Sequence, residues 1–170
     1  MHSIATAAGC YLEGRIMDKP VRKSTRIPHY DYSKDNYYFV TICTHEKKCI
    51  FGTVKMLSRY GKIAADSVRE IPLHYSGVKI DKFIVMPNHI HMIVIIGCDN
   101  TSETKPDLGQ VIGSFKSGVT RKIHETAPDE RIWQRSFHDH VIRSRKDYEK
   151  IWSYVDTNPM RWEQDCFYAE

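Results

Sequence analysis

The sequence predicts an α+β fold in which an antiparallel sheet carries helices mainly on one face. Short runs of aromatic and β-branched residues alternate with longer stretches of helical periodicity. Two of the apolar runs are separated only by Pro87-Asn88, and such a tight connection joins antiparallel strands because parallel strands need a long crossover. A chain of 170 residues is long enough for one domain with its own core and too short for two comfortable ones.

The elements follow from these patterns in chain order. We expect strands at residues 37–44, 78–85, 89–96 and 132–142, a short edge segment at 50–54, and helices at 58–74, 108–125 and 145–158. Ser58 is a candidate cap for the first helix, Pro72 should end or bend it, and Pro159 closes the last. This order matches a ferredoxin-like α+β sandwich. Residues 1–22 are expected to be an irregular arm that precedes one domain at 23–170.

Composition excludes some classes of protein. Hydrophobic residues make up 41% and charged residues 27% of the chain, and no apolar run is long enough to cross a membrane. The N-terminus lacks the features of a secretory signal, so we expect a cytoplasmic protein. The cysteines are odd in number and without metal-binding spacing, which favours reduced thiols; they are Cys10, Cys43, Cys49, Cys98 and Cys166.

His89 and His91 open the third predicted strand and are the first candidate site. Side chains alternate between the faces of a strand, so these imidazoles point the same way and could share one divalent cation. A cation beside a phosphate neutralises charge and polarises the phosphoryl oxygens, so phosphodiester chemistry is one use of such a site. On its own, such a pattern is more often two histidines on a half-buried face than a pair of metal ligands.

Basic residues form a second candidate feature, on a chain whose formal net charge is +4. Several of them lie among aromatic residues, and single-stranded nucleic acid needs both cations for its phosphates and flat surfaces for its bases. The alternative is that the rings belong to the core and the charges to a solvated rim. The candidate DNA-binding residues are Lys116, Arg121, Lys122, Trp133, Arg135, Arg143 and Arg145.

Helical geometry places the two tyrosines of the last predicted helix, Tyr148 and Tyr154, on different faces. A buried stripe is predicted at i, i+3, i+4 and i+7, and consists of Tyr148, Ile151, Trp152 and Val155. Tyr154 and Asn158 are one turn apart and share a flank beside that stripe, from which both could reach a site on the sheet. Asn158 precedes a proline, so it could instead be a turn residue that ends the helix.

Three ordered motifs resemble a known family. They are Pro87-Asn88-His89-Ile90-His91, then Ile132-Trp133-Gln134-Arg135 with Asp139-His140-Val141-Ile142-Arg143, and then Tyr154-Val155-Asp156-Thr157-Asn158-Pro159. Together they resemble the single-tyrosine, histidine-hydrophobic-histidine (HUH) transposases, also called IS200-like, and within them the REP-associated tyrosine transposase branch. The similarity runs from about residue 22 to the C-terminus.

This resemblance implies a single-stranded DNA endonuclease and strand transferase that acts on hairpins or palindromic repeats. It implies that His89, His91 and Asn158 bind Mg²⁺ or Mn²⁺ and that Tyr154 is the nucleophile that forms a 5′-phosphotyrosine. A phenol is a weak nucleophile at neutral pH, which is consistent with the need for a metal. Members of the family act as monomers or homodimers, and the sequence leaves both open.

Two other functions are compatible with the residues. The chain could be a domesticated DNA-hairpin-binding protein that no longer cuts, although the intact candidate site argues against this. It could also be a zinc or iron enzyme that uses His140 beside the first histidine pair, which would hold its metal tightly. We expect His138 and His140, the second pair with one residue between them, to be structural.

Overall fold

A central antiparallel sheet organises the computed structural model of the chain, which describes residues 27, 29–98 and 105–168. Its strands lie in the order β2-β3-β1-β4, so that β1 pairs with both β3 and β4. The strands are β1 (Asn36–Cys43), β2 (Val78–Met86), β3 (His89–Ile96) and β4 (His138–Ile142). This order of strands and helices is that of a split βαβ, ferredoxin-like sheet, so the predicted α+β class is confirmed.

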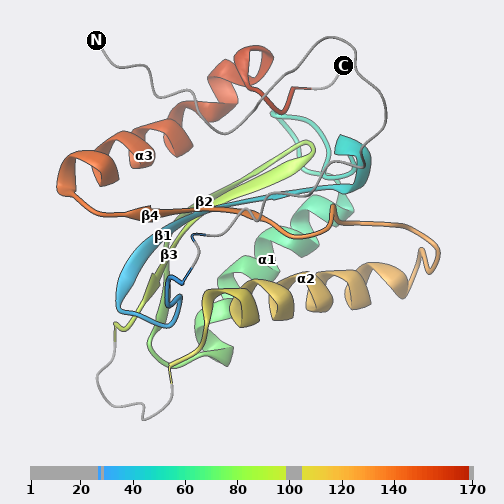
Figure 1. The fold of residues 1–170 in the computed structure, drawn as a ribbon. Coiled ribbons are helices and arrows are strands. Elements are labelled where there is room, and N and C mark those ends of the chain that lie inside the picture. Colours follow the sequence, from blue (N-terminus) through green and yellow to red (C-terminus); the bar gives the residue numbers. More distant parts are fainter. Residues whose placement is uncertain (1–26, 28, 99–104, 169–170) are drawn as a thin grey trace, which may run out of the picture.

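The helices divide between the two faces of the sheet. Figure 1 shows α1 (Arg59–His74) and α2 (Leu108–His124) side by side on one face, and α3 (Arg145–Thr157) across the other. Short 3₁₀ segments are η1 (His45–Lys47), which follows β1, and η2 (Asn158–Gln164), which continues directly from α3. Two of these three helices therefore cover the core face, and the third covers the face that carries the site.

Alternation along the central strands assigns their residues to the two faces. One set packs with α1 and α2 in the hydrophobic core: Tyr38, Val40 and Ile42 of β1, and Ile90, Met92, Val94 and Ile96 of β3. Residues between them in sequence face α3, because successive side chains of a strand point to opposite sides. That second face carries Phe39 and Thr41 of β1 and both histidines of β3.

Local signals in the sequence place most boundaries. Ser58 caps α1 by accepting a hydrogen bond from the amide of Gly61, and Ser144 caps α3 through the amide of Asp147. Asp107 begins α2 with a reciprocal capping box. The hairpin predicted at Pro87-Asn88 joins β2 to β3. Pro72 lies inside α1, which ends two residues later, so it sits in the last turn.

Two predicted strands are shorter than expected. The strand expected at 132–142 begins only at His138, because Ser136 adopts a positive φ of 68° and turns the chain before β4. Trp133 instead forms an isolated bridge with Thr44, just beyond the end of β1. The edge segment expected at 50–54 is reduced to one bridge between Gly52 and Leu57.

The predicted buried stripe of α3 is wrong in its extent. Val155 is the one buried side chain of this helix, whereas Trp152 remains 40% exposed. Polar contacts with β2 attach the helix instead, where the pairing with β3 shifts register between residues 80 and 82. Tyr148 donates a 2.6 Å hydrogen bond to Asp81. Lys82 lies 3.1 Å from the centre of the Trp152 ring and forms a 2.5 Å ion pair with Asp156, so Trp152 packs against a cation at the surface and not in the core.

The predicted N-terminal arm at 1–22 lies outside the described residues. Across the part of the chain that the structure describes, no helix combines the length and the apolar character that a bilayer crossing needs.

Candidate active site

His89 and His91 lie together beneath α3, as the strand periodicity predicts. Their ring centres are 4.4 Å apart, and their side chains are almost completely buried, with exposed fractions of 0% and 1% for the two residues. The Nδ1 atom of His91 is 2.8 Å from the hydroxyl oxygen of Thr41. Phe39 stacks on the His91 ring at 5.3 Å. Neighbouring β1 therefore fixes the orientation of the second imidazole.

Asn88 fixes the protonation of the first imidazole. Its amide nitrogen donates to the carbonyl oxygens of Lys47 and Phe167, at 3.1 and 2.8 Å, so its amide oxygen is the atom that faces His89. That oxygen can only accept, so His89 donates from Nδ1 across 2.9 Å. The Nε2 atom of the neutral ring then carries a lone pair, and this buried atom has no hydrogen-bond partner among the described residues.

Burial keeps both imidazoles neutral. Desolvation lowers the pKa of His89 to about 4, against a smaller opposing effect of the Asp165 charge. Desolvation, together with the neighbouring His89, lowers the pKa of His91 well below its usual value. Histidine binds metal ions in its neutral form, through the lone pair of the unprotonated ring nitrogen.

Tyr154 reaches the histidine pair from α3 of the same chain. Its hydroxyl oxygen is 3.4 Å from Nε2 of His91 and donates a 3.2 Å hydrogen bond to the Asp165 carboxylate. Its ring meets Phe39 edge-on, with 6.0 Å between centres. Burial, and then the charge of Asp165, raises the pKa of the Tyr154 phenol above its ordinary value. Without a cation the hydroxyl therefore stays protonated.

Tyr148, the other tyrosine of α3, lies away from this site. Its hydrogen bond to Asp81 raises its pKa to about 12, followed in importance by burial. Tyr148 thus holds the helix to β2, and Tyr154 alone of the two approaches the histidines.

Asn158 joins the site as the residue that begins η2. It remains in the right-handed helical region, with φ −54° and ψ −42°, although a proline follows. The side chain is 2% exposed, and its amide nitrogen donates to Asp165 across 2.5 Å. Its amide oxygen is buried without a hydrogen-bond partner among the described residues. A buried acceptor without a hydrogen-bond partner is more consistent with Asn158 as a cation ligand than with Asn158 as a helix-ending turn residue.

Asp165 is the residue of the site that the sequence did not reveal. One side-chain atom each from His89, His91 and Asp165 lies within 4.8 Å of the others, and this is the one such group in the described ranges that could hold a metal ion. The aspartate follows η2, seven residues after Asn158, and the 3₁₀ segment with its non-helical Arg161 breaks the α-helical periodicity between the two residues. Neutral nitrogens, a carboxylate and an unpaired amide oxygen fit a divalent cation.

The second histidine pair does not contribute to this group. His140 points to α3 and lies 2.8 Å from the carboxylate of Asp147. His138 is exposed on β4, and its ring centre is 6.4 Å from that of Phe167. The contacts of His140 are with α3, and the structural role of the second pair stays a prediction.

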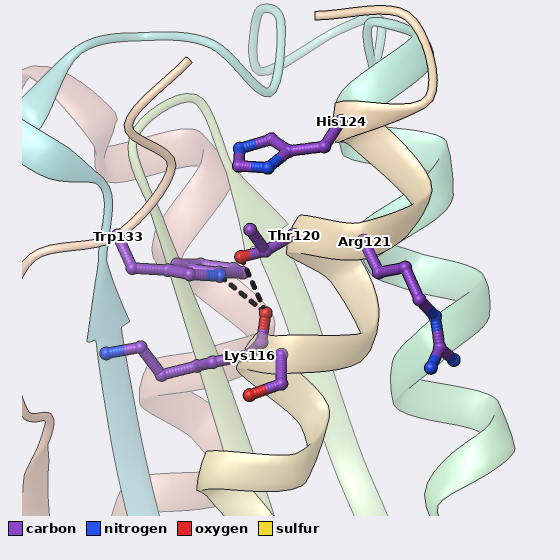
Figure 2. A pocket seen from close by; sticks show the side chains of 6 residues that line it. Lys116, Thr120, Arg121, His124 and Trp133 are labelled. Atoms are coloured by element: carbon purple, nitrogen blue, oxygen red, sulfur yellow. Dashed lines mark hydrogen bonds between the residues drawn. The ribbon is translucent and has the colours of Figure 1, made fainter. Parts of the chain in front are cut away.

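The candidate DNA-binding residues do not form one surface. Lys116, Arg121 and Trp133 line a hollow on α2, on the face of the sheet opposite to α3 (Figure 2). The Trp133 indole donates to the backbone carbonyl of Lys116, and the ammonium of Lys116 donates to the carbonyl oxygens of Gln134 and Ser136.

The remaining candidates lie elsewhere. Lys122 turns toward α1 and forms a 2.6 Å ion pair with Glu70. Arg143 and Arg145 line another hollow, at the start of α3, and Arg145 is paired with Glu149 at 2.8 Å. Arg135 is exposed on the segment before β4.

Comparison with known proteins identifies the family of the chain. Residues 31–158 match the family model described as "Transposase IS200 like". The chain belongs to the IS200-like transposase family. The match spans both histidines, Tyr154 and Asn158, and ends before Asp165.

Individual relatives of this transposase family member support the assignment. A protein of Haemophilus influenzae without a described function is 33% identical over 172 residues, covering 88% of this chain and 94% of its own. A second H. influenzae protein, described as a REP-associated tyrosine transposase, is 23% identical and covers 77% of this chain and 74% of its own.

Solved structures show the same fold. A REP-associated tyrosine transposase bound to a REP hairpin has a TM-score of 0.56 at 18% identity, covering 80% of this chain and 73% of that one. A transposase-like protein from Deinococcus radiodurans R1 has a TM-score of 0.50 at 15% identity, covering 78% of this chain and 95% of that one. At these identities the likeness concerns the fold.

Proposed function

We propose that this transposase family member cuts and rejoins single-stranded DNA at hairpin or palindromic repeats, with Tyr154 as nucleophile and a divalent metal, Mg²⁺ or Mn²⁺, at the histidine pair. The observation that carries the proposal is the 3.4 Å approach of the Tyr154 hydroxyl to Nε2 of His91 within one chain. The hairpin substrate is inferred from the structural relative that was solved with one.

The chain's own residues account for the steps. The Tyr154 oxygen attacks the scissile phosphorus, the bond to the 3′-oxygen breaks, and the 3′-oxygen gains a proton in exchange for the phenolic one. His89, His91 and Asn158 would hold the metal. When bound, the metal would neutralise phosphate charge and make the phosphorus more electrophilic. The covalent phosphotyrosine conserves the ester, so a 3′-hydroxyl can reverse the reaction and join strands.

DNA binding would use exposed arginines together with the half-buried Lys116 and Trp133 of the α2 hollow. We include Lys116, Arg121 and Trp133 of the α2 hollow, together with Arg135, Arg143 and Arg145. Lys122 and Arg145 are weaker candidates than the sequence indicates, because Glu70 and Glu149 already form ion pairs with them.

The test is covalent capture of DNA. Incubation of the protein with labelled single-stranded hairpin DNA and Mn²⁺ should give an adduct that survives denaturing electrophoresis. Tyr154→Phe should abolish the adduct while hairpin binding stays within about twofold, since only the nucleophilic oxygen is removed. Tyr148→Phe is the matched control on the same helix and should retain the adduct.

Equal adduct formation by the Tyr154 variant would move the nucleophile to another residue. Hairpin binding by the unaltered protein without any metal-dependent adduct would instead favour a silent DNA-hairpin-binding protein.

A further inference from the structure

We propose that Asp165 is a direct ligand of the metal and supplies the anionic oxygen that the rest of the site lacks. The inference rests on the proposed function in one respect, namely that a divalent cation binds at the histidine pair. It extends the site beyond the segment that matches the family, which ends at residue 158.

The first argument is convergence of donor atoms. The ligand atoms of His89, His91 and Asp165 lie within 4.8 Å of one another, close enough to contact one ion after small adjustments of the side chains. Nε2 of His89 and the amide oxygen of Asn158 are both buried without hydrogen-bond partners in the described part of the chain. Buried polar atoms are normally satisfied, so two such atoms beside one carboxylate point to a missing positive partner.

The second argument is charge. Imidazole binds metal ions as a neutral ligand and an amide carries no charge, so Asp165 is the one anionic group in the set. Oδ2 of Asp165 accepts hydrogen bonds from Tyr154 and Asn158, both of them neutral donors. No ion pair to this carboxylate occurs among the described residues. The neutral donors do not compensate the negative charge of the Asp165 carboxylate. Mg²⁺ and Mn²⁺ favour carboxylate oxygens, so a cation bound here would compensate it.

The third argument is that the local backbone aims the carboxylate. Oδ1 accepts a 2.7 Å hydrogen bond from the amide of Phe167, which leaves Oδ2 directed at the site. The Phe167 carbonyl in turn accepts from Asn88, and its ring lies 4.8 Å from that of His89. Phe167, two residues after Asp165, therefore ties the segment after η2 to Asn88 and His89. A ligand held this way is oriented before the metal arrives.

Metal titration of the whole chain tests the proposal. Mn²⁺ affinity, measured by calorimetry and by the loss of the free-ion electron paramagnetic resonance signal, should fall at least about tenfold in Asp165→Asn. Asp66→Asn removes the same charge from the exposed face of α1 and should bind Mn²⁺ as the unaltered protein does. Affinity of Asp165→Asn within twofold of the unaltered protein would overturn the proposal and leave Asn158 to complete the site, in which case Asn158→Ala alone would lose affinity.

A second variant separates ligation from a general effect of charge. Asp165→Cys in a Cys166→Ser background should produce a thiolate-to-metal charge-transfer band on addition of Cd²⁺ or Co²⁺, because soft thiolates bind these ions directly. The Cys166→Ser parent, which retains Cys43 near the site, sets the baseline. A band no stronger than that of the parent would contradict direct ligation.

These outcomes are independent of the strand-cutting chemistry. Tyr154→Phe keeps every ligand named above, so its Mn²⁺ affinity should match that of the unaltered protein even though no adduct forms. If the unaltered protein binds no Mn²⁺, both the metal-dependent function and the ligand role of Asp165 fail. If it binds Mn²⁺ through Asp165 but gives no adduct, only the proposed function fails.

Discussion

Asn88 is the residue that connects the histidines to the C-terminal segment. Its oxygen accepts from His89, and its nitrogen donates to the carbonyl oxygens of Lys47 and Phe167. It is completely buried, so each of these contacts replaces hydration that the residue loses on folding. One side chain thus sets the protonated nitrogen of the first imidazole and anchors the segment that carries Asp165.

Replacement of this residue should affect both stability and metal binding. Asn88→Ala leaves Nδ1 of His89 without its buried acceptor and removes the amide donor from the carbonyl oxygens of Lys47 and Phe167. A buried group left unsatisfied costs about 1–3 kcal/mol. Mn²⁺ affinity should fall about 10- to 100-fold, because partners of metal-binding histidines have effects of this size. Thermal unfolding and calorimetric titration measure the two effects.

Asn36→Ala is the matched control for this variant. Asn36 begins β1 at the end opposite to the site, and its amide donates to the Tyr30 hydroxyl. Its Mn²⁺ affinity should remain unchanged, and an equal loss in both variants would mean that Asn88 acts only through general stability.

At the scale of elements, polar side chains of β2 contribute to the attachment of α3 to the sheet. Val155 is its one buried residue, and Lys82 contacts both Trp152 and Asp156 while only 16% of its side chain is exposed. The register shift in β2 presents Asp81 and Lys82 beneath successive turns of the helix. The strand thereby determines where Tyr154 lies relative to the histidines.

Loss of this attachment should slow the reaction more than it weakens DNA binding. Lys82→Ala removes the cation from Trp152 and Asp156, and a small displacement of a nucleophile costs about ten- to hundredfold in rate. The rate of adduct formation and the hydrogen exchange of the α3 amides measure the effect, and exchange should accelerate. Lys62→Ala, on the exposed side of α1, is the control. An unchanged rate and unchanged exchange in Lys82→Ala would show that other contacts position the helix.

At the scale of the whole molecule, the sheet separates two regions that bear on DNA. The candidate active site lies between the sheet and α3, whereas the hollow with Lys116, Arg121 and Trp133 lies on the α2 side. A DNA strand that contacts both regions would have to pass around an edge of the β-sheet. Two neighbouring residues of α2 differ in whether their charge is available to DNA phosphates. Arg121 lines the hollow, whereas Lys122 forms an ion pair with Glu70.

This difference gives a paired prediction for hairpin binding. Arg121→Ala should weaken binding severalfold and reduce the slope of log affinity against log salt by about 1, as expected for a lost phosphate contact. Lys122→Ala should keep the affinity within about twofold, because its charge is already paired. Fluorescence anisotropy over a range of salt concentrations measures both variants, and equal losses would contradict the distinction.

Much of the site follows from sequence because it depends on local geometry. Strand alternation places His89 and His91 together, and helical spacing brings Tyr154 and Asn158 to one flank. Asp165 could not be found this way, since irregular 3₁₀ geometry and a turn bring it to the histidines from the end of the chain. The buried stripe of α3 was wrong because Lys82, distant in sequence, replaces apolar packing with a cation over an indole.

The central position of β1 has an energetic consequence for the fold. Val40 and Ile42 of this strand belong to the core. Phe39 and Thr41, on the opposite face of the strand, both contact His91. A cation that binds only the folded arrangement therefore lowers the free energy of the native sheet as a whole. Metal present at a hundred times its dissociation constant would contribute about 2.7 kcal/mol to unfolding stability, so thermal denaturation could report occupancy of the site without any DNA.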